Sequence, residues 1–240
     1  MSEDATYEQD DTDIVPATIS LPGIELNLEE SAPQPVTASK LGGVPYLAPD
    51  AEQPRDEDGE PLTFLLQIRC EELPPNDFLP ESGLLQFWHG TDDLMGADLD
   101  DPLESAVAVL HIEDPDESVT AEDVLERWEE GDDYTPLPTG TTVEGGGAPE
   151  REFALRFSPA APTDLEDAAG HRLGGHALFV QEDPRPWEDE LRPYTVQLLQ
   201  LDSDESGLCW GDMGVGHFFI TEEQAKARDY SQVLYTWDCG

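Results

Sequence analysis

The residues from Trp210 to His217 combine a histidine, a carboxylate and three glycines, and they are the stretch most suggestive of chemistry. His217 could act as a general base that Asp212 orients, because such a pair supplies a proton acceptor held in position. The alternative is a histidine packed within a strand, since no recognisable motif places a serine or cysteine nucleophile beside it. The glycines superficially resemble a phosphate-binding loop, but no lysine follows them, so a hairpin turn explains them better. We therefore assign no catalytic residue from the sequence.

Four of the eleven basic residues occupy matching places in a repeated pattern. Lys40 to Gly43 recurs 132 positions later as Arg172 to Gly175, and Arg55 and Arg185 each follow a proline. Each arginine could pin a turn by donating to carbonyls or carboxylates. Alternatively, the four cations form a site for an anion or an acidic peptide where the two copies meet. The candidate ligand-binding residues are Lys40, Arg55, Arg172, Arg185, Trp210, Asp212 and His217.

The sequence gives only weak indications of a metal site. Asp202 to Gly207 matches the first half of a calcium-binding loop, but Met213 stands where the bidentate glutamate is required. The acidic loop from Asp92 to Asp101 could add carboxylates. No two histidines have the spacing of neighbours on a helix, and His171 and His176 lack identifiable companions for zinc. We expect no metal and no cofactor.

Acidic residues dominate the composition: 55 Asp and Glu stand against 11 Lys and Arg, which gives a formal net charge of −44 over 240 residues. Such a chain repels nucleic acids and anionic membranes, so we expect neither as a partner. Only two lysines, Lys40 and Lys226, are present. We interpret the acidity as adaptation to molar salt, where the Debye length is about 3 Å. The alternative is a nucleic-acid-like surface that sequesters a basic partner.

The three cysteines, Cys70, Cys209 and Cys239, form no CxxC motif, which indicates a reducing cytosol without disulfides. The N-terminus lacks the basic and apolar regions of a signal peptide, and no apolar run approaches the ~18 residues of a membrane span. We therefore predict a cytoplasmic location.

Further matches extend the repeat. Leu65 to Ile68 corresponds to Leu198 to Leu201, and Gly83 to Leu85 corresponds to Gly207 to Cys209. This order predicts two copies of one supersecondary unit packed together. We expect an α+β fold of two related halves, with mostly antiparallel sheet and a few short helices. Residues 1–13 are predicted to be a disordered acidic arm, and 14–240 one domain, with halves at about 36–130 and 151–240 joined by a linker at 131–150.

Apolar runs and alternating patterns mark the strands, and Ser or Thr followed by an acidic residue or Gln marks the helix starts. Strands are expected over 14–28, broken by Pro22-Gly23, and over 62–68, 84–89, 106–112, 153–157, 194–201, 207–210, 217–220 and 233–237. Helices are expected after Thr120, Thr163 and Thr221.

An ordered set of motifs carries a family resemblance. The motifs are Ser39–Leu47, Phe64–Ile68, Gly83–Phe87, Gln181–Arg185, Trp210–Asp212, Gly216–Ile220, Ala227–Ser231 and Val233–Cys239. From about Ser39 to the C-terminus, the chain resembles the YwqG-like family. The resemblance implies a cytoplasmic microbial α+β domain. It implies no activity, because the family is one of unknown function, although the toxin neighbourhoods of some members suggest an interaction or immunity role.

These observations favour a non-enzymatic cytoplasmic protein that binds a protein or peptide partner, and a basic partner is one form of this expectation. The expectation depends on the lack of a catalytic constellation in a sheet scaffold built from a repeat. The alternative is an enzyme or small-ligand-binding protein with a pocket between the halves, near Arg55, Arg185, Asp212 and His217.

Overall fold

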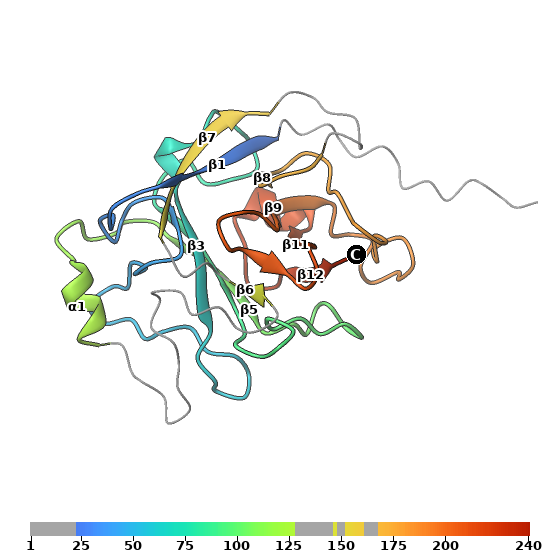
Figure 1. Cartoon of the computed structure of the whole chain (residues 1–240), viewed down its shortest axis with the longest axis horizontal. Coiled ribbons are helices and arrows are strands. Elements are labelled where there is room, and N and C mark those ends of the chain that lie inside the picture. The colour runs from blue at the N-terminus through green and yellow to red at the C-terminus, as the bar shows by residue number, and fades with distance from the viewer. Residues whose placement is uncertain (1–22, 128–145, 148–151, 161–167) are drawn as a thin grey trace, which may run out of the picture.

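Ten antiparallel strands form one curved sheet in the computed structural model, which describes residues 23–127, 146–147, 152–160 and 168–240 (Figure 1). The strand order is β12-β11-β9-β8-β1-β7-β2-β3-β4-β5, and β6 pairs with β10 apart from it. The strands are β1 (Ile24–Glu30), β2 (Lys40–Leu41), β3 (Thr63–Arg69), β4 (Leu84–His89), β5 (Val107–Ile112), β6 (Gly146–Gly147), β7 (Phe153–Pro159), β8 (Arg172–Leu173), β9 (Val196–Asp202), β10 (Cys209–Trp210), β11 (Val215–Ile220) and β12 (Leu234–Asp238).

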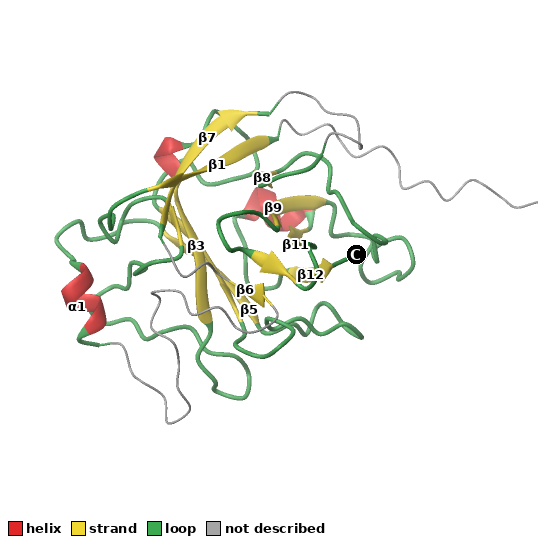
Figure 2. Ribbon diagram, in the orientation of Figure 1, coloured by secondary structure: helices red, strands yellow, loops and turns green. Residues whose placement is uncertain are grey.

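The expected α+β class is wrong, because the described chain is nearly all β (Figure 2). Its helical segments are α1 (Ala121–Leu125), α2 (Glu222–Ala227) and the 3₁₀ turn η1 (Cys70–Glu72). Capping boxes at Thr120 and Thr221 open α1 and α2, as the sequence predicts. Each helix then ends within two turns, so the caps correctly mark where helices begin but say nothing of how far they continue.

The strands β1 and β7 are exchanged between the two halves of the sheet. β1 precedes the first half in sequence, yet it pairs with β8 of the second half, where Ile24 lies opposite Leu173. β7 begins the second half, yet it pairs with β2 of the first half, where Leu41 lies opposite Phe153. β1 and β7 also pair with each other from Ile24↔Pro159 to Glu30↔Phe153, and they lie side by side in Figure 1. Each half therefore depends on a strand supplied by the other.

Buried glutamines mark the same position in both halves. Gln67 on β3 lies opposite Lys40, and Gln200 on β9 lies opposite Arg172. The Gln200 Nε2 donates to the carbonyls of Ala168 and Gly170 at 2.7 and 2.9 Å. The Gln67 Nε2 donates in the same way to two carbonyls of the segment before β2. These side chains tie each connecting segment to the sheet, because a fully buried amide must satisfy its donors and acceptor internally.

One landmark of the predicted repeat is wrong. Gly207 to Cys209 does not correspond to Gly83 to Leu85, because Cys209 belongs to β10, which pairs with β6 outside the main sheet. The structural counterpart of β4 is β11: Gln86 lies opposite Gln67, and His217 lies opposite Gln200. In the first half the Gly83-Leu84 pair leads into β4, whereas in the second half the Gly207-Leu208 pair lies in a turn before β10.

The concave side of the sheet encloses the main hydrophobic core, to which both halves contribute. Phe87 of β4 contacts Phe218 of β11 with ring centroids 5.3 Å apart. The segment before β5 also covers the free edge of β12, where the Pro102 carbonyl accepts from the Tyr235 backbone at 3.3 Å. The curved sheet therefore approaches a closed barrel without a complete ladder between β5 and β12.

Each half also has a smaller core on the outer side of its strands. In the first half, Tyr46 and Leu62 pack against Phe64, Trp88 and Val124. In the second half, Leu191 and Tyr194 pack against Phe219 and Leu234, with Phe179 at the margin. The long connections β2–β3 and β8–β9 thus cover the outer face of the strands that follow them.

Most predicted strands are confirmed within a few residues, and β4 has the predicted limits. Several predictions lie outside the described residues: the arm over 1–13, the strand before Pro22, the helix after Thr163 and most of the linker over 131–150.

We predict that Gln200→Leu strongly destabilises the fold. The substitution leaves the Ala168 and Gly170 carbonyls and the Leu178 amide, which donates to the Gln200 Oε1 at 2.9 Å, without their side-chain partner. The expected loss is about 2–4 kcal/mol of unfolding free energy, measured by urea denaturation. Gln232→Leu is the control, because Gln232 is exposed. Equal stability of the two variants would contradict the proposed role of Gln200.

Candidate functional site

Arg185 and His217 meet on the outer face of β11, beneath the connection between β8 and β9. The Arg185 guanidinium carbon lies 4.0 Å from the centroid of the Phe219 ring, a cation–π distance. The His217 ring is tilted against Phe179, with centroids 4.2 Å apart. Arg185 and His217, two of the candidates predicted from the sequence, are 32 positions apart and meet through the rings of Phe179 and Phe219.

Asp183 and a carbonyl hold the Arg185 side chain in place. The Arg185 Nε and Nη2 donate to the two carboxylate oxygens of Asp183 at 2.9 and 2.7 Å, which is a bidentate pair. Its Nη1 donates to the Tyr194 carbonyl at 3.0 Å. Arg185 therefore ties two parts of the β8–β9 connection together and holds them against Phe219 of β11.

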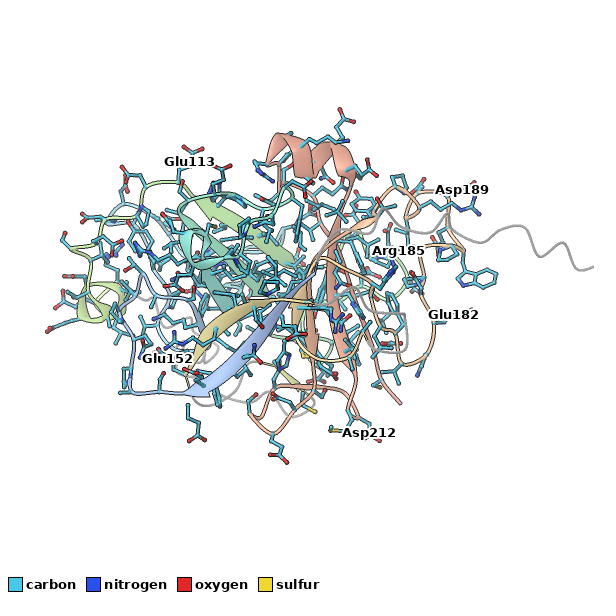
Figure 3. All side chains as sticks on the ribbon, turned by 90° about the horizontal axis from the view of Figure 1, so that it is seen from above. Glu113, Glu152, Glu182, Arg185, Asp189 and Asp212 are labelled. Atoms are coloured by element: carbon cyan, nitrogen blue, oxygen red, sulfur yellow. The ribbon has the colours of Figure 1, made fainter. Side chains whose placement is uncertain are left out.

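His217 is fully buried, and its chemistry follows from that burial. Burial, with a smaller contribution from the Arg185 charge, lowers the pKa of His217 to about 3, although the Leu178 backbone partly opposes both effects. Neither ring nitrogen has a well-formed hydrogen bond among the described residues. The Asp212 carboxylate does not orient the ring, and Figure 3 shows Asp212 well away from Arg185. A buried neutral imidazole of this kind is not poised for general base catalysis near pH 7.

Lys40 and Arg172 are buried at matching positions of the two halves. The Lys40 Nζ donates to the Val44 carbonyl at 2.8 Å and lies 3.7 Å from the Glu152 carboxylate. Burial lowers the pKa of Lys40, whereas Glu152 raises it. The Arg172 Nη2 donates to the Ala169 carbonyl at 2.6 Å. Both cations thus hold the segments beside the Gly-Gly turns.

Arg55 does not join Arg185. It lies on the β2–β3 connection, exposed, and its Nη1 donates to the Gly59 carbonyl at 2.9 Å. Figure 1 shows this connection, in blue to cyan, apart from the orange β8–β9 connection. The structure therefore does not gather Arg55, Arg185, Asp212 and His217 around one pocket.

Trp210 points into the main core instead of toward the Arg185 cluster. Its ring lies 6.5 Å from His89 and 6.3 Å from Tyr235, measured between centroids. A Cβ added at Gly216 would come within 2.7 Å of the Trp210 ring, so the glycine makes room for the indole. The turn predicted within Trp210 to His217 is present, because the Gly214 amide donates to the Trp210 carbonyl at 2.8 Å.

Trp187, which the sequence analysis missed, is the most exposed large apolar side chain among the described residues. It is 71% exposed and is followed directly by the exposed Glu188, Asp189 and Glu190. Its loop is ordered by local bonds: the Trp187 amide donates to the Pro184 carbonyl at 3.1 Å, and Arg192 pairs with Asp189 at 2.9 Å. Arg185 anchors the same loop from beneath. The sequence marks Trp187 only as an isolated tryptophan between prolines and acidic residues, and this segment has no helical or strand periodicity.

A second candidate is an open depression of about 520 Å³ between the halves. Its lining is Pro80, Glu81, Ser82, His111, Glu113, Asp114 and Arg228. None of the candidate ligand-binding residues from the sequence lines it. The His111 Nε2 lies 2.9 Å from the Ser82 carbonyl, and the Arg228 Nη1 donates to the Ala225 carbonyl at 3.2 Å.

Two carboxylates of the partial calcium loop already form hydrogen bonds within the protein. Asp202 accepts from the Gly170 amide at 3.0 Å, and Asp204 lies 3.0 Å from the His171 Nε2. Within the part of the chain that the structure describes, no group of three His, Cys, Asp or Glu side chains is placed to hold a metal ion.

Residues 39–239 match the model of a family described as a domain of unknown function, DUF1963. The chain belongs to the DUF1963 family. This family is compatible with the YwqG-like resemblance, although the finer name stays a prediction. No curated protein matches the chain. All seven candidate residues and Trp187 lie within the DUF1963 match, and neither described helix has the length and apolarity needed to cross a bilayer.

We predict that His217→Phe makes the DUF1963 fold less sensitive to acid. The folded pKa of His217 is about 3, so below about pH 6 the unfolded chain takes up a proton that the folded chain excludes. The wild type therefore loses about 1.4 kcal/mol per pH unit from this group between about pH 6 and pH 4, and the variant does not.

Urea denaturation at pH 7, 5 and 4 measures this difference. His176→Phe is the control, because His176 is partly exposed on the same connection. If the stability curves of His217→Phe and wild type stay parallel over this range, the buried neutral state of His217 is disproved.

Proposed function

We propose that this DUF1963 protein is a non-enzymatic binding protein that engages a positively charged protein or peptide through the Trp187 surface. We define this surface as Trp187 with Glu188, Asp189 and Glu190. The observation that carries the proposal is the 71% exposure of Trp187 on a loop that contains several internal hydrogen bonds. Tryptophan is the residue type most enriched at the energetic centres of protein interfaces.

The bonds that order the Trp187 loop support a role in binding. Arg185 is held by Asp183 and the Tyr194 carbonyl, and it stacks on Phe219 of the sheet. The Arg192 Nη2 also donates to the Pro186 carbonyl at 3.1 Å. A loop that is already ordered loses little conformational entropy when a partner docks, so more of the contact energy appears as affinity.

Charge indicates the chemistry of the partner. Three consecutive carboxylates follow Trp187, and the whole chain carries a net charge of −44. Lysine and arginine side chains on a partner would complement this surface and speed its association. In molar salt the long-range attraction is screened, so the apolar contact of Trp187 would then supply most of the affinity.

The three cysteines are free, one buried and two partly buried, which supports a reducing, cytoplasmic location as part of the proposal. The immunity role suggested by the YwqG-like resemblance would be one form of such binding.

The alternative of an enzyme between the halves gains no specific support, because Arg55, Arg185, Asp212 and His217 share no pocket in the described chain.

We predict that Trp187→Ala strongly weakens partner binding without unfolding the protein. Purified protein immobilised as bait is used to capture basic proteins from cell extract at about 0.1 M and about 2 M KCl, and the strongest captured protein is then purified and titrated. Truncating an interface tryptophan costs about 2 kcal/mol or more, so the affinity should fall at least about 30-fold.

Met213→Ala is the matched control, because Met213 is 63% exposed and lies beside Asp212, away from the Trp187 loop. It should bind as the wild type does. A captured set that is identical for wild type and Trp187→Ala would overturn the proposed surface, and failure to capture any basic protein would count against the binding function.

A further inference from the structure

Three polar side chains lie near one another inside the curved sheet, and each has a polar atom without a hydrogen-bond partner among the described residues. His89 comes from the first half, and Trp210 and Tyr235 come from the second; all three are 0% exposed. The His89 Nε2, the Trp210 Nε1 and the Tyr235 hydroxyl have no hydrogen-bond partner within the described part of the chain. We call these three side chains the buried polar cluster.

The buried polar cluster is part of a continuous aromatic contact between the halves. Phe87 contacts Phe218 at 5.3 Å, and Phe218 contacts Tyr235 at 4.7 Å between centroids. Tyr235 and His89 each lie within 6.5 Å of Trp210. The hydroxyl of Thr63, which stands opposite His89 in the ladder, is also buried without a partner. Four unpartnered polar atoms, one each from Thr63, His89, Trp210 and Tyr235, therefore belong to side chains that adjoin this contact.

The hydrogen-bonding roles in the cluster are complementary. The His89 Nδ1 lies 2.7 Å from the Gly90 carbonyl, which can only accept, so Nδ1 carries the proton and Nε2 is an acceptor. Burial lowers the pKa of His89 and keeps the ring neutral. The Trp210 Nε1–H can only donate, whereas the Tyr235 hydroxyl can do both. The cluster thus requires an occupant that donates and accepts.

The surroundings favour a small neutral occupant. Burial raises the pKa of Tyr235, and the negative charge of Asp92 raises it further; the same charge disfavours an anion beside the hydroxyl. No group of three metal-binding side chains occurs among the described residues. All three side chains are fully buried, and water is the smallest neutral molecule that can both donate and accept among them.

We propose that the buried polar cluster binds ordered internal water, which donates to the His89 Nε2 and accepts from both the Trp210 Nε1 and the Tyr235 hydroxyl. This water forms a hydrogen-bonded bridge between the two halves. Buried polar atoms in folded proteins nearly always have such partners. The inference does not depend on the Trp187 surface.

The sign of the stability change in Tyr235→Phe tests the proposal. If the hydroxyl binds water, its removal lowers the Tm by about 2–4 °C. If the hydroxyl has no partner, its removal relieves a desolvation cost and raises the Tm. Tyr46→Phe is the control, because the Tyr46 hydroxyl accepts from the Asp116 amide at 2.9 Å, and its loss should lower the Tm.

Oxygen-17 magnetic relaxation dispersion on the intact protein then counts long-lived internal waters. The proposal predicts fewer such waters in Tyr235→Phe than in wild type, and a water within hydrogen-bond distance of the His89 Nε2 in a high-resolution crystal structure. An unchanged count overturns the proposal whatever the Tm shift, and so does density there for a larger molecule.

Discussion

The exchange of β1 and β7 is the constraint on which the rest of this structure depends. Neither half can complete its own sheet, because the strand that begins each half in sequence forms its ladder with the other half. The seven paired positions between β1 and β7 then join the halves into one sheet. Curvature of that sheet brings Phe87 against Phe218 and creates the enclosed core. Interlocking of this kind makes the two halves one cooperative unit rather than two modules.

The residues that stabilise the junction of the halves differ from those of the candidate interaction surface. The buried glutamines Gln67 and Gln200, the cations Lys40 and Arg172, and the aromatic contact inside the sheet all serve the junction or its connecting segments. The β8–β9 connection is different: Arg185 fixes it from below, and Trp187 projects from it into solvent. Loops carried on a rigid scaffold are where binding residues concentrate in many folds. Arg185, together with the packing of Leu191 and Tyr194, thus joins the candidate interaction surface to the rigid core.

The sequence predicts local features well and long-range ones poorly. The limits of β4 and the caps at Thr120 and Thr221 follow from apolar runs and side-chain spacing, which are local signals. The α+β class fails because a cap does not encode helix length, and the strand exchange is invisible because periodicity does not name a pairing partner. Arg185 and His217 could be selected as rare residue types, but their contact through Phe179 and Phe219 is tertiary. Trp187 carries no pattern that distinguishes an interface from a loop.

Separate production of the two halves tests the central claim most directly. The chain is divided between residues 135 and 136, and each fragment is measured alone and after mixing, by circular dichroism and calorimetry. Because β1 and β7 complete the opposite halves, neither fragment alone should unfold cooperatively, and an equimolar mixture should recover the spectrum and the single melting transition of the intact chain. A cooperative transition in either isolated fragment would contradict the interlocked sheet and show that the halves are independent modules.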